Sequence, residues 1–388
     1  AQAFCAASYN LGLRLPTMRR CLSVVSDEDI IRLVQHGGAV SAEPTQLDAF
    51  MDPFWTALAR PIPRCISPNL LSVLGGAAGL LSAIIAVAAA QWEVVGMHSG
   101  PYICASLLMF SYMNFDAVDG KHARATRQCT PLGAVVDHGI DALIASCIGV
   151  AVCITVDPRL ASVRLMGAHC AWHCSWFCAQ WVEWSLGILD TRGITEGEFG
   201  VMLVLALPGV AGRDIFGWKL PGASMSFGVV LETLIGTGCA LVALAQITRV
   251  CLRCDSLSGM ARACVPVVHL LCHLALGLLL SSSELGHSAP LLCFLAVAQN
   301  ACLLMTKMRL VATLRSERFP VVCVDALPFG AVVCAHALLG VPCASTALLA
   351  VLCWQLACFF AMWSDALSRL CDALDLCLLG EVPEPKVL

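Results

Sequence analysis

The residues best suited to chemistry in this chain are four aspartates at fixed offsets, Asp116, Asp119, Asp137 and Asp141. The first two are three residues apart and the last two are four apart, so on helices each pair shares one face. Clustered carboxylate oxygens are ligands that Mg²⁺ and Mn²⁺ prefer. The spacing therefore predicts two carboxylate pairs that face each other and hold divalent cations, two ions in our interpretation.

The aspartates lie between two apolar segments that are suited to a membrane. Residues 101–115 lead in, residues 142–156 lead out, and Pro131 can turn the chain between two helices. An aspartate at mid-bilayer costs roughly 2.5–3.5 kcal/mol, so four facing lipid would cost about 10–14 kcal/mol. One lysine and two arginines nearby are too few to neutralise four carboxylates and an anionic substrate. We therefore favour carboxylates that are bound to cations.

The composition excludes an ordinary soluble protein. Of the 388 residues, 59% are hydrophobic and only 13% are charged, compared with about 25% charged in soluble domains. The 24 cysteines lie in apolar runs, where free cysteine behaves as a small hydrophobe, so disulfides are not expected. We predict an all-α, polytopic membrane protein with about ten membrane-spanning helices of roughly 20 residues each. The expected spans are 69–90, 99–120, 132–156, 163–184, 197–213, 225–248, 261–282, 288–308, 319–341 and 344–366.

The distribution of basic residues predicts which side faces the cytosol. With ten spans and a cytosolic N-terminus, one side holds only Arg159, Arg164, Arg213 and Lys219, and the other holds the remaining 19 of the 23 Lys and Arg. Cytosolic segments of membrane proteins are enriched in these residues. We therefore expect both termini and the aspartates on the cytosolic side, where nucleotides are available.

The aspartates belong to a longer pattern of fixed residues. It reads Asp116-x2-Asp119-Gly120-x2-Ala123-Arg124-x8-Gly133-x3-Asp137-x3-Asp141. This pattern resembles the signature of the CDP-alcohol phosphotransferases, with every position filled. Pro68-Asn69, His138-Gly139 and residues 179–200 also resemble the choline/ethanolamine phosphotransferase branch, although Trp184 stands where that branch more often has tyrosine. The resemblance extends over about residues 50–220.

The resemblance implies a membrane enzyme that transfers phosphocholine or phosphoethanolamine from CDP-choline or CDP-ethanolamine to diacylglycerol. The products are a phospholipid and CMP, as in the last step of the Kennedy pathway. The implied partners are these CDP-alcohols, diacylglycerol and membrane lipids, with no nucleic acid, and the implied location is the endoplasmic reticulum or Golgi with the active site facing the cytosol. Apolar faces such as 291–304 and 347–361 lead us to expect a homodimer.

The chain divides into four parts on this interpretation. Residues 1–65 are a cytosolic or interfacial region, in which residues 47–60 form an amphipathic helix at the membrane interface or packed on the membrane domain. Residues 66–220 hold the catalytic helices. Residues 221–370 add spans for lipid entry or dimer contact, and residues 371–388 are a cytosolic tail.

The resemblance and the chemistry of phosphates together imply the residue roles. The four aspartates are the metal ligands. A guanidinium suits phosphate geometry, so Arg124 neutralises a phosphate, and Lys121 either assists or is a surface lysine. Asn69 either hydrogen-bonds the donor or caps the first span. Room for the nucleotide and its phosphates is left by small residues, namely Gly120, Ala123 and Gly133.

The acceptor hydroxyl must lose a proton, and the two candidates for the catalytic base are His138 and Asp141. A carboxylate that holds a cation is a poor base, whereas a neutral imidazole titrates nearer to neutral pH, so we favour His138. The alternative role of His138 is a hydrogen bond to a ligand carboxylate.

Two acidic residues are candidates for contact with a cationic headgroup. Glu196 and Glu183 are expected near the cytosolic face, with cation–π contact from Trp181 or Trp184. The alternative is helix capping and interfacial anchoring.

For three further pairs of residues, we expect a role in helix packing rather than in metal binding or redox chemistry. These are His169 with His173, His269 with His273, and Cys251 with Cys254.

Three other functions compete with this interpretation. They are a sibling transferase with another lipid acceptor, a cation transporter with an acidic pathway, and a non-catalytic scaffold. Transporters often show related halves, and the sequence shows no such repeat.

Overall fold

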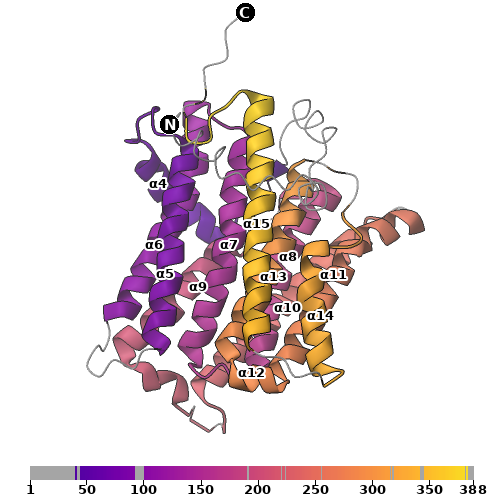
Figure 1. The fold of residues 1–388 in the computed structure, drawn as a ribbon. Coiled ribbons are helices and arrows are strands. Elements are labelled where there is room, and N and C mark those ends of the chain that lie inside the picture. The colour runs from indigo at the N-terminus through magenta and orange to yellow at the C-terminus, as the bar shows by residue number, and fades with distance from the viewer. Residues whose placement is uncertain are drawn as a thin grey trace, which may run out of the picture.

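The structure is a computed structural model, and it is a helical bundle. It describes residues 40–41, 44–91, 100–189, 192–219, 221–222, 224–254, 256–314, 316, 319–340, 345–380 and 382. Most of the sequence-predicted N-terminal region, residues 1–39 and 42–43, lies outside this description. The helices, with the labels of Figure 1, are α4 (Gln46–Ala59), α5 (Pro68–Gln91), α6 (Gly100–Thr126), α7 (Pro131–Val156), α8 (Val163–Leu186), α9 (Ile194–Ala211), α10 (Phe227–Cys251), α11 (Leu257–Ser281), α12 (Glu284–Ser288), α13 (Pro290–Thr313), α14 (Leu327–Ala337) and α15 (Ser345–Leu374).

Little of the described chain forms other regular structure. Two-residue strands, β1 (Val40–Ser41) and β2 (Ile188–Leu189), pair in parallel with Val40 opposite Ile188. Short 3₁₀ helices occupy Arg213–Gly217 and Val324–Ala326. The predicted all-α class is therefore confirmed.

Local sequence signals set the start of the helix that carries half of the aspartates. The Thr130 side chain accepts a hydrogen bond from the backbone N–H of Gly133, and Pro131 occupies the first turn of α7. An N-cap threonine followed by proline favours a helix start, because the first backbone N–H groups have no partner within the helix. The phase of α7 is thereby fixed just before Asp137 and Asp141.

Seven of the described helices are long and apolar enough to cross a membrane: α5, α7, α9, α10, α11, α13 and α15. Helices α6 and α8 have 27 and 24 residues but more polar sequences. The ninth expected span, 319–341, forms only the 11-residue α14 after a 3₁₀ turn. At 1.5 Å per residue α14 is about 16 Å long, roughly half of a bilayer core. The count of ten spans thus stays a prediction.

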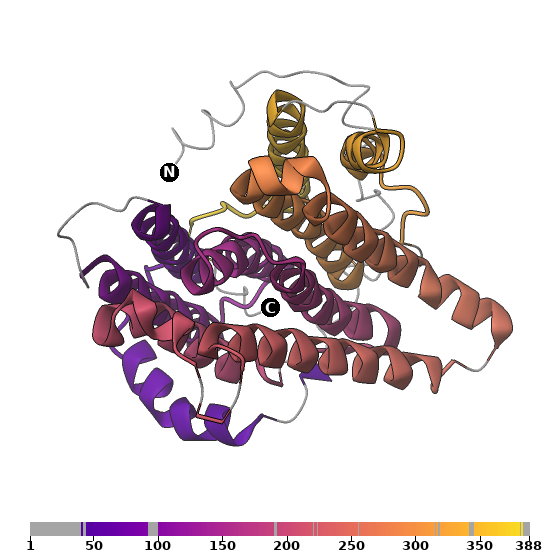
Figure 2. The ribbon, with the colours of Figure 1, turned by 90° about the horizontal axis from the view of Figure 1, so that it is seen from below.

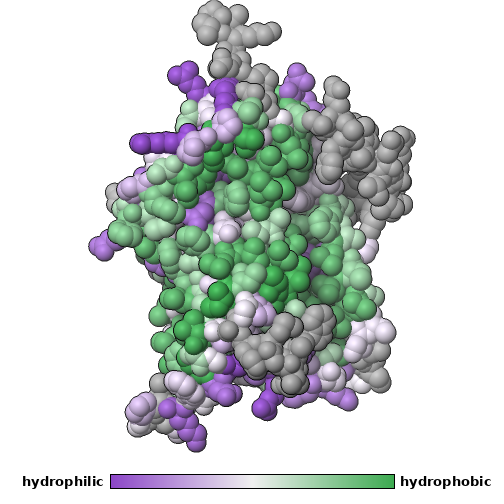
Figure 3. Space-filling model, turned by 90° about the vertical axis from the view of Figure 1, so that its left-hand side faces the viewer, coloured by the Kyte–Doolittle hydropathy of each residue, from purple (hydrophilic) through white to green (hydrophobic). Residues whose placement is uncertain are grey.

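The surface of the bundle fits a membrane. Figure 3 shows a broad apolar band around the middle of one face, with hydrophilic groups gathered towards both ends. Large apolar side chains that are exposed include Leu107 and Phe110 on α6, and Leu203 and Val210 on α9. Burial of such side chains in lipid replaces their costly exposure to water.

Small residues bring the first three long helices close together. A Cβ atom on Gly76 of α5 would lie 2.5 Å from Cγ2 of Ile140 on α7, and one on Gly75 would lie 2.7 Å from Cβ of Phe115 on α6. Close approach of this kind is what small residues permit between membrane helices. Helix α5 therefore fixes α6 and α7, the two helices that carry the aspartates.

The later helices pack directly on this unit. Helix α13 contacts α7, α8 and α15, and most of its side chains are buried. Figure 2 shows the early helices (indigo and purple) on one side of the bundle and the late helices (orange and yellow) on the other. The division at residue 220 therefore does not separate the site from the C-terminal half, because α13 borders α7.

Candidate active site

A cavity of about 690 Å³ opens between the ends of α4, α6, α7, α8, α9 and α13. It is lined by three of the four predicted aspartates, Asp116, Asp137 and Asp141, together with His138. Six acidic residues line the cavity, namely Asp48, Asp52, Asp116, Asp137, Asp141 and Glu198, against three basic ones, Lys121, Arg124 and Arg309. The wall thus carries an excess of negative charge that suits a cation.

Three of the four aspartates converge on the cavity, and Asp119 does not face it. Asp116 of α6 lies beside Asp137 and Asp141 of α7. Asp119 is only 5% exposed and does not line the cavity; its carboxylate accepts a hydrogen bond from the Ser72 hydroxyl of α5. Three carboxylates therefore face one space, and the fourth is held against α5.

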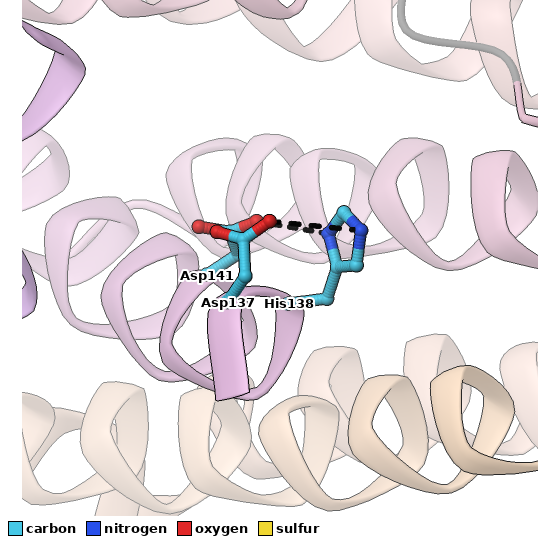
Figure 4. Close-up of side chains that lie close together, drawn as sticks. All are labelled: Asp137, His138 and Asp141. Atoms are coloured by element: carbon cyan, nitrogen blue, oxygen red, sulfur yellow. Dashed lines mark hydrogen bonds and ion pairs between the residues drawn. The ribbon is translucent and has the colours of Figure 1, made fainter. Parts of the chain in front are cut away.

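Asp137, His138 and Asp141 form the one cluster of possible metal ligands found among the described residues. One ligand atom each of Asp137, His138 and Asp141 lies within 4.8 Å of the others, and Figure 4 shows both carboxylates beside the imidazole. Nδ1 of His138 is 3.2 Å from Oδ2 of Asp141, and Nε2 is 3.8 Å from Oδ2 of Asp137. An ionised carboxylate only accepts hydrogen bonds, so the Asp141 contact favours a proton on Nδ1, and a neutral imidazole then has its lone pair on Nε2.

Asp141 has a second hydrogen-bond donor. The Tyr112 hydroxyl of α6 donates to Oδ1 of Asp141 at 2.7 Å, and both residues are buried. The two oxygens of Asp141 are therefore oriented separately, one by Tyr112 and one by His138.

The predicted cationic residues lie at the cavity wall. Arg124 lines it, and a Cβ atom on Gly120 would lie 3.3 Å from the Arg124 guanidinium, so the glycine leaves space for this side chain. Lys121 donates to the carboxylate of Asp52 on α4. This contact lowers the pKa of the Asp52 carboxyl below its ordinary value.

Helix α4 closes one side of the cavity. Besides the Asp52 contact, Asp48 accepts from the Thr195 hydroxyl at 2.6 Å, and the Trp55 indole donates to Asn114 at 3.1 Å. The predicted helix at 47–60 is therefore present and docked on α6 and α9. Its exposed row is apolar, consisting of Phe50, Phe54 and Leu58.

The remaining predicted substrate contacts lie beside the cavity rather than in its wall. The Asn69 amide donates to the carbonyl of Leu378 at 2.7 Å, so it binds the segment after α15. A Cβ atom on Gly133 would lie 3.4 Å from the Asn69 oxygen, and Ala123 is buried. None of these three side-chain positions lines the cavity described by the structure.

The acidic residues suggested for a cationic headgroup are placed differently from expectation. Glu196 is exposed and does not line the cavity, whereas Glu198, two residues later on α9, is buried and does. Glu183 is buried and accepts from the guanidinium of Arg309, so it is not free for a headgroup.

Sequence reasoning missed Glu198 and Arg309 as site residues. A usable signal existed, because an ionisable residue within an apolar membrane helix is functional by default.

Of the predicted histidine pairs, His169, His173 and His273 are buried and His269 is half-buried, and none lines the acidic cavity. His169 and His173 are T-shaped neighbours with ring centroids 4.3 Å apart, and His273 lies 5.7 Å from His173. His269 faces the Pro320 carbonyl at 3.1 Å. Cys251 and Cys254 are free thiols in the described chain.

Comparison with known proteins matches the region that forms this cavity. Residues 65–189 match the family model described as CDP-alcohol phosphatidyltransferase. This part of the chain is a CDP-alcohol phosphatidyltransferase domain. The match includes all four aspartates, His138 and Arg124, but neither Glu198 nor Arg309.

Several of the similar curated proteins are named cholinephosphotransferase 1. Cholinephosphotransferase 1 of Gallus gallus is 27% identical over 219 residues, which cover 55% of this chain and 64% of that protein. The protein of the same name in Homo sapiens is 28% identical over 216 residues, or 53% and 51%. The uncharacterized CDP-alcohol phosphatidyltransferase class-I family protein 2 of Dictyostelium discoideum is 24% identical over 202 residues, or 51% and 48%. The chain thus matches about half to two thirds of the length of these relatives.

A second, apolar cavity adjoins the acidic one. It has a volume of about 250 Å³ and shares Tyr112, Trp176 and Glu198 with the acidic cavity. A third cavity of about 390 Å³ shares Trp172 and Val201 with the second and continues between α7, α8, α9 and α10. The acidic site therefore borders an apolar space within the bundle.

Proposed function

We propose that this protein transfers phosphocholine, phosphoethanolamine or both from the CDP-alcohol to diacylglycerol. The observation that carries the proposal is a cavity with converging carboxylates next to an apolar space. A nucleotide diphosphate ester requires charge neutralisation and a lipid alcohol requires an apolar approach, and these needs meet at Glu198 and Tyr112, which border both cavities.

The residues present fit divalent cations. Asp137, His138 and Asp141 offer oxygen and nitrogen ligand atoms within 4.8 Å of one another, and Asp116 lies beside them. Oxygen-rich sites of this kind suit Mg²⁺ or Mn²⁺. We propose two ions held by the four aspartates. When bound, such ions neutralise the diphosphate and stabilise the charge that develops on the departing CMP.

The protein residues then bind and orient the reactants. The acceptor hydroxyl oxygen attacks the phosphorus that carries the choline or ethanolamine, and the bond from that phosphorus to the bridging oxygen breaks. CMP leaves with the bonding electron pair. Arg124 and Lys121 donate hydrogen bonds to the phosphates, a task for which the guanidinium fork is well suited.

His138 is the proposed acceptor of the hydroxyl proton. Asp141 binds Nδ1 and leaves Nε2 available to take the proton, as the carboxylate of a catalytic triad does for its histidine. Asp141 thus acts both as a ligand and as the residue that orients the base. Glu198 is also a buried acid, and it lies where the apolar cavity meets the acidic one.

The test of this proposal is CMP release by the purified full chain in mixed micelles with diacylglycerol. CDP-choline, CDP-ethanolamine and CDP-diacylglycerol are supplied in separate reactions, each with Mg²⁺, with Mn²⁺ or with EDTA. We expect metal-dependent CMP release and a new phospholipid with one or both of the first two donors. Turnover of CDP-diacylglycerol alone would instead indicate a sibling transferase, and cation flux into vesicles without CMP release would indicate a transporter.

We also propose that the site faces the cytosol of an endoplasmic reticulum or Golgi membrane. The support is the uneven distribution of Lys and Arg along the chain. A homodimer remains our proposal for the assembly. Mass measurement in mild detergent tests it, and a monomeric mass would contradict it.

A further inference from the structure

Arg309 brings a buried cation to the acidic cavity from a helix outside the matched family region. It lies on α13, is 5% exposed, and lines the cavity together with Asp137 and Asp141. The family match ends at residue 189 and does not include this side chain.

One N–H group of the Arg309 guanidinium is hydrogen-bonded to the protein, and another has no acceptor among the described residues. Nη1 of Arg309 donates to Oε2 of Glu183 on α8. Nε of Arg309 is buried and has no hydrogen-bond partner among the described residues. Arginine has five N–H donors in a planar fork, and a buried donor without an acceptor carries a desolvation cost. Among the described residues this donor has no acceptor, and the same side chain borders the acidic cavity.

A second buried ion pair on the same helix lies outside the acidic cavity. Lys307, two residues earlier on α13, is 4% exposed and donates to Asp325, which is 1% exposed. Neither Lys307 nor Asp325 lines the acidic cavity. The two pairs are alike in burial and helix, but only the arginine reaches the site.

We propose that Arg309 binds a phosphate oxygen of the CDP-alcohol and that Glu183 positions it. This inference rests on the proposed function, because it assigns the diphosphate as the missing acceptor. Arginine is suited to the task, since its charge persists on burial and its fork matches phosphate geometry. With Arg124 on α6, the site then has guanidinium groups from two helices that are far apart in sequence.

Binding measurements separate this inference from the proposed reaction. CDP-choline, CMP and cytidine are titrated into the full chain in detergent with Mg²⁺, and KM and kcat are measured where turnover is seen. The variants are Arg309→Gln, Arg309→Lys and Glu183→Gln. Lys307→Gln is the matched control, because it breaks an equally buried ion pair on the same helix.

We expect Arg309→Gln to weaken CDP-choline binding by about 10- to 150-fold, the range for hydrogen bonds to charged groups. Cytidine has no phosphate, so its binding should change less than twofold. Arg309→Lys should recover part of the loss, and Glu183→Gln should raise KM with a smaller effect. Lys307→Gln should lower the Tm at least as much as Arg309→Gln but leave the affinity for CDP-choline within about twofold.

Two outcomes overturn the inference. One is that Arg309→Gln and Lys307→Gln bind CDP-choline with equal affinity when the same fraction of each protein is folded. The other is an equal loss of cytidine binding, which would mean that Arg309 only maintains the fold. If the wild-type chain binds CDP-choline through Arg309 but transfers nothing to diacylglycerol, the proposed reaction fails while the assignment of Arg309 stands.

Discussion

The contact between Gly76 and Ile140 is expected to set the position of α7, the helix that carries Asp137 and Asp141. Gly76 lies on α5, and Ile140 directly precedes Asp141 on α7. In Gly76→Ala, the new Cβ atom would lie 2.5 Å from Cγ2 of Ile140. Optimal separations between such carbon atoms are about 3.5–4.0 Å. The two helices must therefore separate by about 1 Å at this point.

Two consequences follow for the Gly76→Ala variant. Overpacking of a well-packed core costs roughly 1–3 kcal/mol of unfolding free energy. A shift of about 1 Å in the position of reacting groups can cost about 100-fold in rate. We therefore expect CMP release to fall about 100-fold, while the protein still folds in detergent.

The assay combines turnover with thermal unfolding in a double-mutant cycle. Ile140→Ala removes the Cγ2 atom that the new methyl group meets, so Gly76→Ala with Ile140→Ala should recover at least tenfold of the lost rate. Gly167→Ala on α8 is the control, because its Cβ would lie 3.8 Å from Cδ2 of Leu278, an ordinary contact. It should leave turnover unchanged. Wild-type turnover in Gly76→Ala, or no recovery in the double variant, would refute this account of α7.

Three further predictions concern the cavity itself. Asp137→Asn removes a proposed ligand and should reduce CMP release at least about 100-fold at 1 mM Mg²⁺, with partial recovery at higher Mg²⁺; full activity at low Mg²⁺ would remove Asp137 from the ligand set. His138→Gln should lower kcat about 10²- to 10⁴-fold, the usual contribution of a general base, while CDP-choline still binds; near-normal kcat would exclude the role. The contact with Lys121 lowers the pKa of Asp52. The stabilisation that this ion pair gives to the docking of α4 is therefore fully present above the ordinary pKa of aspartate, and it is lost as the pH falls through the lowered pKa. Proteolytic release of α4 should therefore be unchanged between pH 6 and 8 and increase below about pH 4, and Asp52→Asn should remove this dependence; a change centred near pH 6 would contradict it.

The sequence predicted the acidic motif and the starts of most long helices to within a few residues. The four aspartates follow helical spacing, and Thr130 with Pro131 marks the start of α7 within one residue of the prediction at 132. These are local properties, because capping and hydrophobic length depend on residues close together in the chain. The segment 319–341 is the exception, since its apolar length did not become a full-length helix.

Only the tertiary structure decided which polar residues reach the cavity. The motif at 195–198 contains two glutamates, and the packing of α9 on α6 turns Glu198 inward and leaves Glu196 exposed. Arg309 reaches Glu183 and the cavity because α13 packs on both α7 and α8, a contact between segments more than a hundred residues apart. Neither composition nor periodicity predicts a contact between residues so far apart in the chain, because the contact depends on how whole helices pack. The physical reason is that a helix fixes the direction of its own side chains, whereas their partners are chosen by the fit of one helix surface to another.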